Sequence, residues 1–453
     1  MKHRAVLPLC LLLAAALAGF PLSAPAEGAP PASAESAAEA SGTPCAESTD
    51  GPEAAAKAAS GPESPGAESP APAESPVMLR NGGSFLLAVR EDGSIIGWGD
   101  NRRGQLGMSA ARVHTRPVAA AEGIDGNALK DIQCGNNNTL FLMKDGTVYT
   151  CGTYSHGTQG LGKLDRIVKT PTRIPALSRI VQVSCGFGHN AALDGDGHIW
   201  VWGRNDLGQL GTGNRKSLDE PVMLELENIV DVTCGGKFTL ARDAEGREYG
   251  WGSNAYRVLE DSSRKEILSP VPLTGLEGLR VVSFAGGSDM AFWLDDQGGL
   301  WSRGRNELKQ CGSREAAWKT SPNLTRVDIP EKVVTIIGYS SVPIALTEDG
   351  NAYIWGCTTN GQIGKGKNPG ASFPEKGWDT GDCVQVAAGS IFTSLMDADG
   401  RIWVTGYNSY GQLGNGTTSA TFHWTWNGTN VRQTGDPAEE AKAALEAEKA
   451  GGK

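Results

Sequence analysis

The stretch CGFGHNAALDGDGHIWVWGRNDLGQLGTG, residues Cys185–Gly213, contains the features that decide the fold of this chain. It follows an apolar run, and within it the turn GDG joins the short segment NAALD to the aromatic-rich segment HIWVWG. Asp-Gly between runs rich in β-branched and aromatic residues is a strong signal of a β-hairpin, because these turn residues accept positive φ angles. A Gly-rich loop with the tetrapeptide GQLG comes next. The stretch therefore predicts short strands, joined by a tight turn, that lead into a loop built on glycine.

The pattern of this stretch recurs along the chain with a period near 50 residues. Its last strand ends each time in a Gly, and successive copies of this Gly are separated by 53, 51, 49, 52, 52 and 50 residues. The seven positions are Gly99, Gly152, Gly203, Gly252, Gly304, Gly356 and Gly406. A unit of three or four short strands cannot bury its own face, whereas units arranged radially bury one another and close into a ring. The sequence therefore predicts an all-β fold, a seven-bladed β-propeller over residues 77–433.

Both ends of the repeat region are partial units, which bears on how the ring closes. The segment SPVMLRNGG, from Ser75, resembles the strand and Gly that open the other units. The last unit instead continues after its GQLG into SATFHWTWNGTNV. We predict that Val77–Arg80 completes the final blade or joins it to the first.

The tetrapeptide Gly-Gln-Leu-Gly, once with Ile in place of Leu, occurs in four of the units. Gly lets the backbone turn sharply, and the Gln amide can satisfy backbone groups of the turn. We predict that the Leu fills the space between neighbouring blades, so that the tetrapeptide is a structural joint. Its residues are Gly104, Gln105, Leu106, Gly107, Gly208, Gln209, Leu210, Gly211, Gly361, Gln362, Ile363, Gly364, Gly411, Gln412, Leu413 and Gly414.

These motifs also carry a family resemblance. The succession of Cys-Gly, Gly-His-Asn-Ala-Ala-Leu, Ile-Trp, Trp-Gly, Asn and Gly-Gln-Leu-Gly resembles the regulator of chromosome condensation repeat, in seven in-phase units over about residues 77–430. The resemblance implies a seven-bladed propeller. The best-known member of that family exchanges nucleotide on a nuclear GTPase and binds chromatin. This chain looks more like the secreted bacterial branch, which includes a propeller-type inhibitor of β-lactamases.

Three segments lie outside the predicted propeller. Residues 1–26 combine the basic start MKHR, a long apolar run and an Ala-x-Ala motif, which indicates a secretory signal peptide or, if it is not cleaved, a membrane anchor. Residues 27–76 are rich in Ala, Pro, Ser and Glu and predict a disordered acidic spacer. Residues 434–453 predict a solvated helical tail, because Leu445 is their only large apolar residue.

The acidity of the chain lies in its spacer. Residues 27–76 carry nine acids and one Lys, whereas residues 77–433 carry 37 acids against 35 bases. The predicted propeller is therefore nearly neutral and has no basic block, which argues against a nucleic-acid partner. It also contains no phosphate loop or dinucleotide fingerprint, so we predict no nucleotide and no cofactor.

The sequence contains turns where a catalytic or metal site would be sought. DGDG at Asp194–Gly197 and DADG at Asp397–Gly400 resemble the start of a calcium loop. The twelfth position from either Asp is an Asn rather than a Glu, and other units place KDG, EDG or DQG there, so we interpret both as hairpin turns. The six His residues show no ligand spacing, and no Gly-x-Ser-x-Gly elbow occurs. The sequence predicts no catalytic residues and no metal.

The cysteines fall into a regular and an irregular set. Cys134, Cys185 and Cys234 hold one position in successive units, and we predict small buried side chains too far apart for a disulfide. Among the irregular ones, Cys311 and Cys357 are candidates for a disulfide in an oxidising compartment. The sequence leaves that connectivity open.

The aromatic residues separate into core and candidate surface sets. Eight of the 12 Trp residues fall in predicted second or third strands, where we expect them to be buried. The stretches SREAAWKTSPN and ASFPEKGWDTGD and the last unit hold off-pattern aromatic residues, which would suit a binding hot spot or pack over blade edges. These candidates for partner binding are Trp318, Trp378, Phe373, Trp424 and Trp426.

Together these features predict an exported, non-catalytic binding module, periplasmic or extracellular, that recognises a protein through loops on one face. Contact with a membrane is expected only if the signal stays uncleaved. One alternative is an envelope enzyme of the propeller lyase or hydrolase kind, which needs carboxylates or His at one mouth of the ring. Another is a binder of glycans or cell wall.

Overall fold

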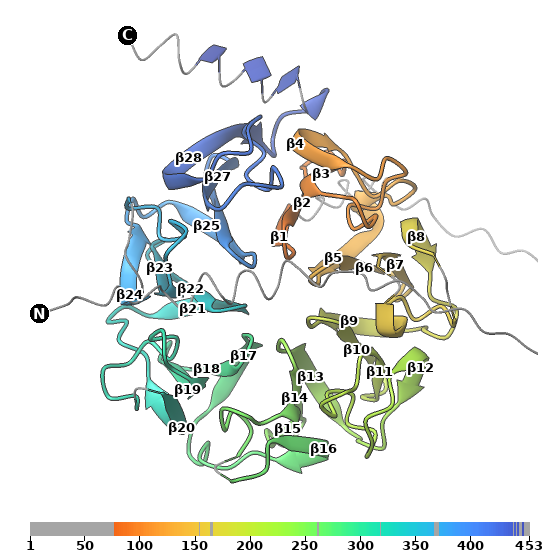
Figure 1. The fold of residues 1–453 in the computed structure, drawn as a ribbon, viewed down its shortest axis with the longest axis vertical. Helices are drawn as coiled ribbons and strands as arrows, with labels where there is room; N and C mark the ends of the chain where they lie inside the picture. Colours follow the sequence, from red (N-terminus) through yellow and green to blue (C-terminus); the bar gives the residue numbers. More distant parts are fainter. Residues whose placement is uncertain are drawn as a thin grey trace, which may run out of the picture.

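The chain forms a ring of seven sheets, which confirms the propeller that the repeat predicts (Figure 1). The predicted signal peptide and spacer lie outside the residues that the structure describes. The computed structural model describes residues 77–437, apart from residues 154, 164–165, 261, 318 and 367–370, together with residues 439–440, 442–443 and 446–447.

Each sheet, or blade, consists of four antiparallel strands in chain order, with the first strand innermost. Blade 1 is β1–β4, and each following set of four strands forms the next blade, up to β25–β28 in blade 7. The strands are β1 (Met78–Asn81), β2 (Phe85–Val89), β3 (Ile95–Asp100), β4 (Val113–Ala119), β5 (Leu129–Cys134), β6 (Asn138–Met143), β7 (Val148–Gly152), β8 (Val168–Arg173), β9 (Ile180–Cys185), β10 (His189–Asp194), β11 (Ile199–Gly203), β12 (Leu218–Met223), β13 (Ile229–Cys234), β14 (Phe238–Asp243), β15 (Glu248–Ser253), β16 (Glu266–Pro272), β17 (Val281–Gly286), β18 (Met290–Asp295), β19 (Leu300–Arg305), β20 (Thr320–Arg326), β21 (Val333–Tyr339), β22 (Val342–Thr347), β23 (Ala352–Cys357), β24 (Ala371–Trp378), β25 (Cys383–Ala388), β26 (Phe392–Asp397), β27 (Arg401–Gly406) and β28 (Thr421–Asn430). Two short 3-10 segments, η1 (Gly126–Ala128) and η2 (Ser155–Gly157), lie in connections.

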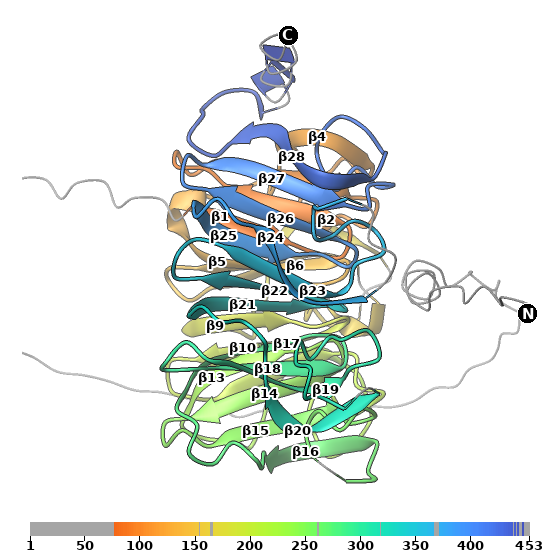
Figure 2. The same ribbon diagram turned by 90° about the vertical axis from the view of Figure 1, so that its left-hand side faces the viewer.

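The strands run from one face of the ring to the other (Figure 2). The turn between the second and third strands, and the link from each fourth strand to the next blade, leave from the end that we call the hairpin face. The turn between the first and second strands, and the loop between the third and fourth, leave from the opposite end, the loop face.

An Asp side chain closes the hairpin between the second and third strands. In blade 3 the Asp194 carboxylate accepts hydrogen bonds from the backbone N–H groups of Asp196 and His198 and from the Trp200 indole, each at 3.0 Å. Gly197 takes a φ of 85°, which a side chain would oppose. Corresponding carboxylates accept the same kind of backbone bonds at Asp243, Asp295 and Asp397.

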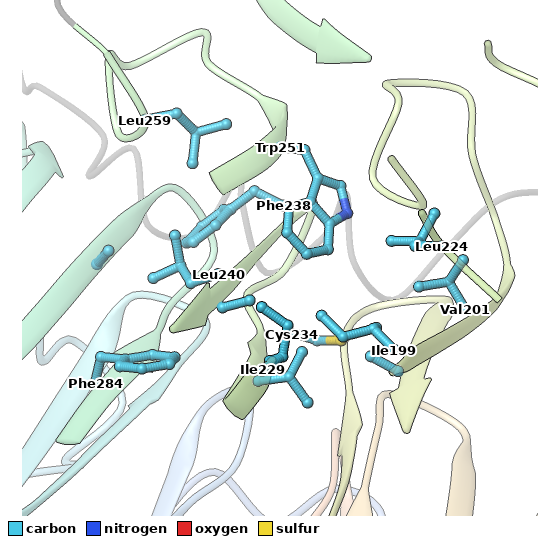
Figure 3. Close-up of a cluster of buried hydrophobic side chains, with 14 of the residues drawn as sticks. Ile199, Val201, Leu224, Ile229, Cys234, Phe238, Leu240, Trp251, Leu259 and Phe284 are labelled. Atoms are coloured by element: carbon cyan, nitrogen blue, oxygen red, sulfur yellow. The ribbon is translucent and has the colours of Figure 1, made fainter. Parts of the chain in front are cut away.

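The hydrophobic core lies between neighbouring blades. Figure 3 shows one region of it, where Trp251 and Phe238 of blade 4 gather with Val201 of blade 3 and Phe284 of blade 5 in one buried cluster. Apolar burial contributes about 25 cal/mol per Å², and these side chains are buried by more than one blade. Each blade therefore depends on its neighbours for stability.

The ring closes without a shared blade. β1 is the innermost strand of blade 1, so of the two predicted arrangements Val77–Arg80 joins the final blade to the first. The Gln385 side chain of β25 accepts a hydrogen bond from the Leu79 N–H at 3.0 Å and donates one to the Val77 carbonyl at 2.7 Å. The amide of Gln385 thus links the first and last blades across a separation of about 300 residues in the sequence.

The same amide joint occurs inside the ring, between blades 3 and 4. The Gln182 side chain accepts from the Val232 N–H at 3.2 Å and donates to the Asp231 carboxylate at 2.8 Å. Val232 and Leu79 hold corresponding places in their innermost strands. The closing seam therefore uses the same chemistry as a seam that the chain itself spans.

The chain after β28 also crosses the closing seam. The Glu91 N–H donates to the Val431 carbonyl at 3.1 Å, and the Arg432 guanidinium lies 3.1 Å from the Glu91 carboxylate. Further on, Glu440 pairs with the buried guanidinium of Arg90 at 2.7 Å. Most described residues of the tail are exposed, and the ion pair of Glu440 is a contact that the sequence did not predict.

Loss of the Gln at the closing seam should open the ring at its ends, because no covalent link holds blade 7 to blade 1. Gln385→Ala leaves the Leu79 N–H and the Val77 carbonyl without partners, at a cost of about 1–3 kcal/mol. We expect hydrogen exchange to show faster opening of β1. Gln182→Ala is the matched control and should loosen β13 while β1 stays protected. Equal protection of β1 in both variants would contradict this account of closure.

Each Gly-Gln-Leu/Ile-Gly tetrapeptide bends between two blades. Its glycines have φ angles between 68° and 83°. Leu210 is fully buried in the cluster that contains Trp251 of the next blade. The Gln209 side chain accepts from the Leu207 N–H at 2.8 Å, and the Gln209 carbonyl accepts from the Thr239 hydroxyl of the next blade at 2.9 Å. Turn, amide and buried Leu together join the two blades.

An Asn near the start of the loop holds the tetrapeptide in place, a role that the sequence analysis did not assign. The Asn205 Oδ1 accepts from the Leu210 N–H at 2.9 Å, and its Nδ2 donates to the carbonyls of Asn214 and Lys216 at 3.0 and 3.1 Å. The repeated spacing Gly-x-Asn was the available signal. Four other loops use Asn101, Asn254, Asn306 and Asn408 in the same way.

Blades 4 and 5 lack the tetrapeptide but keep its geometry. Arg257 and Lys309 stand in the place of its first Gly and take φ angles of 56° and 61°. Arg303 stands where other blades have the Trp before Gly, and its guanidinium donates to the carbonyls of Val258 and Leu259 at 2.9 and 3.0 Å. The position in the ring, rather than the residue type, therefore imposes this conformation.

The last Gly of the tetrapeptide should be intolerant of a side chain because an indole lies against it. A Cβ at Gly211 would come within 2.9 Å of the Trp251 ring, whereas a Cβ at Gly213 would meet nothing nearer than the Ser269 hydroxyl at 3.6 Å. The two glycines have φ angles of 72° and 76°, so an Ala is equally strained at both. We expect Gly211→Ala to cost about 1–3 kcal/mol more than Gly213→Ala in chemical denaturation. Equal losses would show that the indole contact contributes nothing.

Candidate functional site

A central cavity of about 460 Å³ runs along the axis of the ring. The innermost strands β1, β5, β9, β13, β17, β21 and β25 surround it (Figure 1). Gln133, Ser184 and Thr233 provide polar groups on its wall, and Leu79 and Phe284 provide apolar surface. A cavity of this size and mixed lining can hold a small ligand or a protruding side chain.

Aromatic side chains and backbone hydrogen bonds obstruct the mouth of the cavity at the loop face. The rings of Phe187 in blade 3 and Tyr339 in blade 6 meet across the axis, with their centroids 5.6 Å apart. Backbone hydrogen bonds also join the turns of adjacent blades: the Gly83 N–H donates to the Gly135 carbonyl, and the Ser390 N–H donates to the Gly83 carbonyl. Entry to the cavity therefore leads through the hairpin face.

The mouth at the hairpin face is ringed by valines. The second residue of β9, β13, β17, β21 and β25 is a Val with an exposed fraction between 39% and 52%. These are five of the seven large hydrophobic side chains that are exposed in the described part of the chain. Val77 and Lys130 hold the corresponding places in blades 1 and 2. We call the ring the valine collar: Val77, Lys130, Val181, Val230, Val282, Val334 and Val384.

The hairpin face around the collar is acidic. Its connecting segments contain 18 Asp and Glu against 6 Lys and Arg, a formal charge of −12. The described parts of the segments that leave from the loop face contain 16 Lys and Arg against 5 Asp and Glu. The nearly neutral total for residues 77–433 thus hides two sets of connections with opposite charge.

The cavity wall offers no acid–base pair for catalysis. Among the described residues that line it there is no His, Asp or Glu, and Arg80 is paired with Asp131 at 2.8 Å. Burial raises the pKa of the Cys134 and Cys234 thiols to about 12, which keeps them protonated and poorly nucleophilic at neutral pH. The described wall of this cavity therefore offers no His or carboxylate to act as a catalytic acid or base.

One cluster of the described residues has the atom types of a metal site. Asp194, Asp196 and His198 each offer a ligand atom, within 4.8 Å of one another. The Asp194 carboxylate already accepts two backbone hydrogen bonds and one from the Trp200 indole. The cluster is a hairpin turn, and blades 4 and 7 build the same turn with carboxylates at the first two positions and an Arg in place of His198.

None of the seven cysteines among the described residues forms a disulfide. Cys134, Cys185 and Cys234 lie along the cavity wall. Cys311 takes the place of the tetrapeptide Leu in blade 5, where its N–H donates to the Asn306 side chain at 3.0 Å. The disulfide that the sequence left open between Cys311 and Cys357 is not formed.

Two buried ionisable groups lie in the body of the ring, away from the cavity wall. The His189 Nε2 lies 3.1 Å from the Thr239 hydroxyl. Burial lowers the pKa of His189 to about 4, so its imidazole is neutral at pH 7. Glu248 is 5% exposed, its carboxylate oxygens have no hydrogen-bond partner, and burial raises its pKa to about 8. The corresponding residues of the other blades are apolar: Ile95, Val148, Ile199, Leu300, Ala352 and Ile402.

Replacing Glu248 should stabilise the protein, and more so at higher pH. Below the usual Glu pKa of about 4.5 the carboxyl is neutral in both states, and as pH rises toward 8 only the unfolded state releases its proton, which favours unfolding. We expect Glu248→Leu to gain about 1–3 kcal/mol at pH 5 from removing an unpaired polar group. The gain should grow between pH 5 and 8 in urea denaturation and then level off. Glu245→Gln, on the exposed hairpin nearby, is the control, and a gain that does not change with pH would contradict the buried carboxyl.

Two of the candidate aromatic residues are packed in the seam between blades 6 and 7. Trp378 is 8% exposed, and its ring centroid lies 5.2 Å from that of Trp403 and 5.8 Å from that of Trp424. The Trp424 indole donates to a backbone carbonyl of blade 6 at 2.8 Å and lies against Gly364. Blade 7 has Thr405 where other blades have the Trp before Gly, so Trp424 takes over that packing role. Trp378 is buried and unavailable to a partner, contrary to the surface hypothesis.

The other candidate residues are less enclosed. Phe373 is half-buried, with the Lys309 amine and the Arg314 guanidinium each 4.7 Å from its ring centroid. Trp426 is half-buried and donates to the Thr429 carbonyl at 3.0 Å. Trp318 lies outside the described residues, and its role stays a prediction. Neither Phe373 nor Trp426 lines the cavity. Sequence reasoning missed the cavity because its wall comes from seven distant strands.

Comparisons with known proteins agree with this architecture. Residues 45–341 match the family described as the RCC1-like domain, and the chain belongs to that family. Among the described residues, no helix is long and apolar enough to span a membrane.

Several characterised proteins are similar over most of the chain. The E3 ubiquitin-protein ligase HERC2 of Homo sapiens is 31% identical over 365 residues, which cover 76% of this chain and 7% of the ligase. The probable E3 ubiquitin-protein ligase HERC4 of Homo sapiens is 32% identical over 380 residues, 71% of this chain and 31% of that protein. The ultraviolet-B receptor UVR8 of Arabidopsis thaliana is 29% identical over 351 residues, 76% of this chain and 68% of the receptor. The chain thus spans only a small part of the two ligases.

Solved structures show the same fold. Human WBSCR16 superposes with a TM-score of 0.63 at 22% identity, covering 74% of this chain and 93% of that one. Yeast RCC1 (Prp20), in its complex with Kap60, superposes with a TM-score of 0.61 at 22% identity, covering 69% and 78%.

Proposed function

We propose that this chain is an exported, non-catalytic bacterial member of the RCC1-like family that binds a protein through one face of its propeller. The observation that carries the proposal is the mouth of the ring at the hairpin face. This mouth leads into a cavity of about 460 Å³ whose described wall contains no His, Asp or Glu. Exposed valines surround the mouth. Apolar side chains gathered at one place on a surface mark interaction sites.

The solved relatives support protein recognition as a use of this fold. One structure shows yeast RCC1 with Kap60 bound, and another is of Prp20p, described with its binding properties to Gsp1p and histones. Those partners belong to those proteins. Export is supported by the basic start, apolar run and Ala-x-Ala motif of residues 1–26, and it implies a partner in the periplasm or outside the cell.

The first test is capture of a partner by the protein after export. The full chain with a C-terminal tag is produced in a bacterial host, and mass spectrometry of its N-terminus is expected to find residue 27. A protein retained from the envelope fraction is then purified and titrated by calorimetry, where we expect saturable 1:1 binding. Trp318→Ala measures the contribution of the predicted loop hot spot.

A glycan array with the same protein tests the main alternative. Binding to sugars without any titratable protein partner would overturn the proposal in favour of a glycan or cell-wall binder. Turnover of an envelope substrate would overturn it in favour of an enzyme.

A further inference from the structure

We propose that the valine collar and the cavity behind it receive an apolar anchor residue from a basic peptide segment of the partner. This inference rests on the proposed function and deepens it, because it names the face and the chemistry of the partner.

The collar is the apolar part of the argument. Five valines at one repeated position are each 39–52% exposed around the same opening. The other two large exposed hydrophobic side chains of the described residues, Val222 and Met223, lie on the outer strand β12, away from the axis. Removal of these valines from water requires a ligand that covers the axis of the ring, and a peptide that crosses the mouth does so.

The cavity is the reason for a single protruding anchor. It extends from Val77 and Val384 at the collar to Tyr339 near the loop face. Leu79 and Phe284 give an inserted side chain apolar contacts. A volume of about 460 Å³ exceeds that of any one side chain, so an aromatic anchor fits with room for water. Anchors of this kind in desolvated pockets carry most of the affinity of many interfaces.

The acidic segments of the hairpin face predict that the peptide residues on either side of the anchor are basic. The connecting segments of the hairpin face carry 18 acids against 6 bases, so the field around the mouth attracts cations. The cations nearest to the mouth are already engaged. The Lys130 amine donates to the Val181 carbonyl at 2.8 Å, and Arg80 pairs with Asp131. An acidic peptide would meet the net repulsion of these segments, which the Lys130 amine on the collar reduces by one charge.

The chain's own spacer does not have the required chemistry. Residues 27–76 precede Val77 directly, but they carry nine acids and one Lys. Their charge has the same sign as the face. The occupant is therefore a segment of another protein, with Lys or Arg on both sides of a large apolar residue.

Selection of random twelve-residue peptides displayed on phage, with the full chain as bait, tests the inference. We expect enrichment of peptides with Lys or Arg flanking an aromatic or large aliphatic residue. An enriched peptide, synthesised with a fluorescent label, should bind in fluorescence anisotropy, and more weakly as salt is raised. Replacement of its central residue by Ser should raise the Kd at least tenfold.

Isosteric variants of the collar locate the site. The triple variant Val230→Thr, Val282→Thr and Val334→Thr keeps β-branching at exposed positions, so its melting temperature should stay close to the parent. Its Kd for the enriched peptide should rise at least tenfold. The control pair Val222→Thr and Met223→Thr removes the exposed apolar side chains of β12 and should leave the Kd unchanged.

The contrary outcomes separate this inference from the proposed function. Enrichment of acidic peptides, or undiminished binding by the collar variant, would overturn the collar site while leaving protein recognition intact. A failure to enrich any peptide would also overturn it. The proposed function itself would be overturned by binding to sugars without any titratable protein partner, or by turnover of an envelope substrate.

Discussion

The contact between the loop of one blade and the third strand of the next is the interaction on which the rest of the structure depends. Leu210 is buried against Trp251 of the following blade, and Gly211 leaves no room for a side chain beside that indole. Since each blade shares its core with its neighbours, the ring folds as a unit. The Asn205 side chain accepts a hydrogen bond from the Leu210 N–H and so holds Leu210 in position.

Because the blades are joined in this way, the two faces of the ring have different structures. The loops from the loop face turn back between the blades. The turns of this face hydrogen-bond to one another around the axis, so that this end of the cavity is obstructed. The hairpin face carries short turns that satisfy their own polar groups through an Asp carboxylate. It is therefore free to present the valine collar and an excess of acids to solvent.

The irregular seams show which features the ring cannot do without. Arg303 stands where a Trp is usual, and its guanidinium donates to the loop carbonyls that an indole would otherwise meet. In blade 7, Thr405 stands in the place of this Trp. Trp424 of β28 packs against Gly364 instead. A donor and a flat apolar surface against the last part of the loop are required, and several residue types supply them.

The sequence by itself determined the number of blades, the strands, the Asp-Gly hairpins and the tetrapeptide joint, because each depends on residues within one period of about 50. Only the tertiary structure decided which aromatic residues are buried, since Trp378 meets Trp424 from another blade. It also decided how the first and last blades meet, which mouth of the cavity is obstructed, and which face of the ring is acidic. These properties arise from residues that lie far apart in the chain, such as Phe187 and Tyr339, and that become neighbours only when the ring closes.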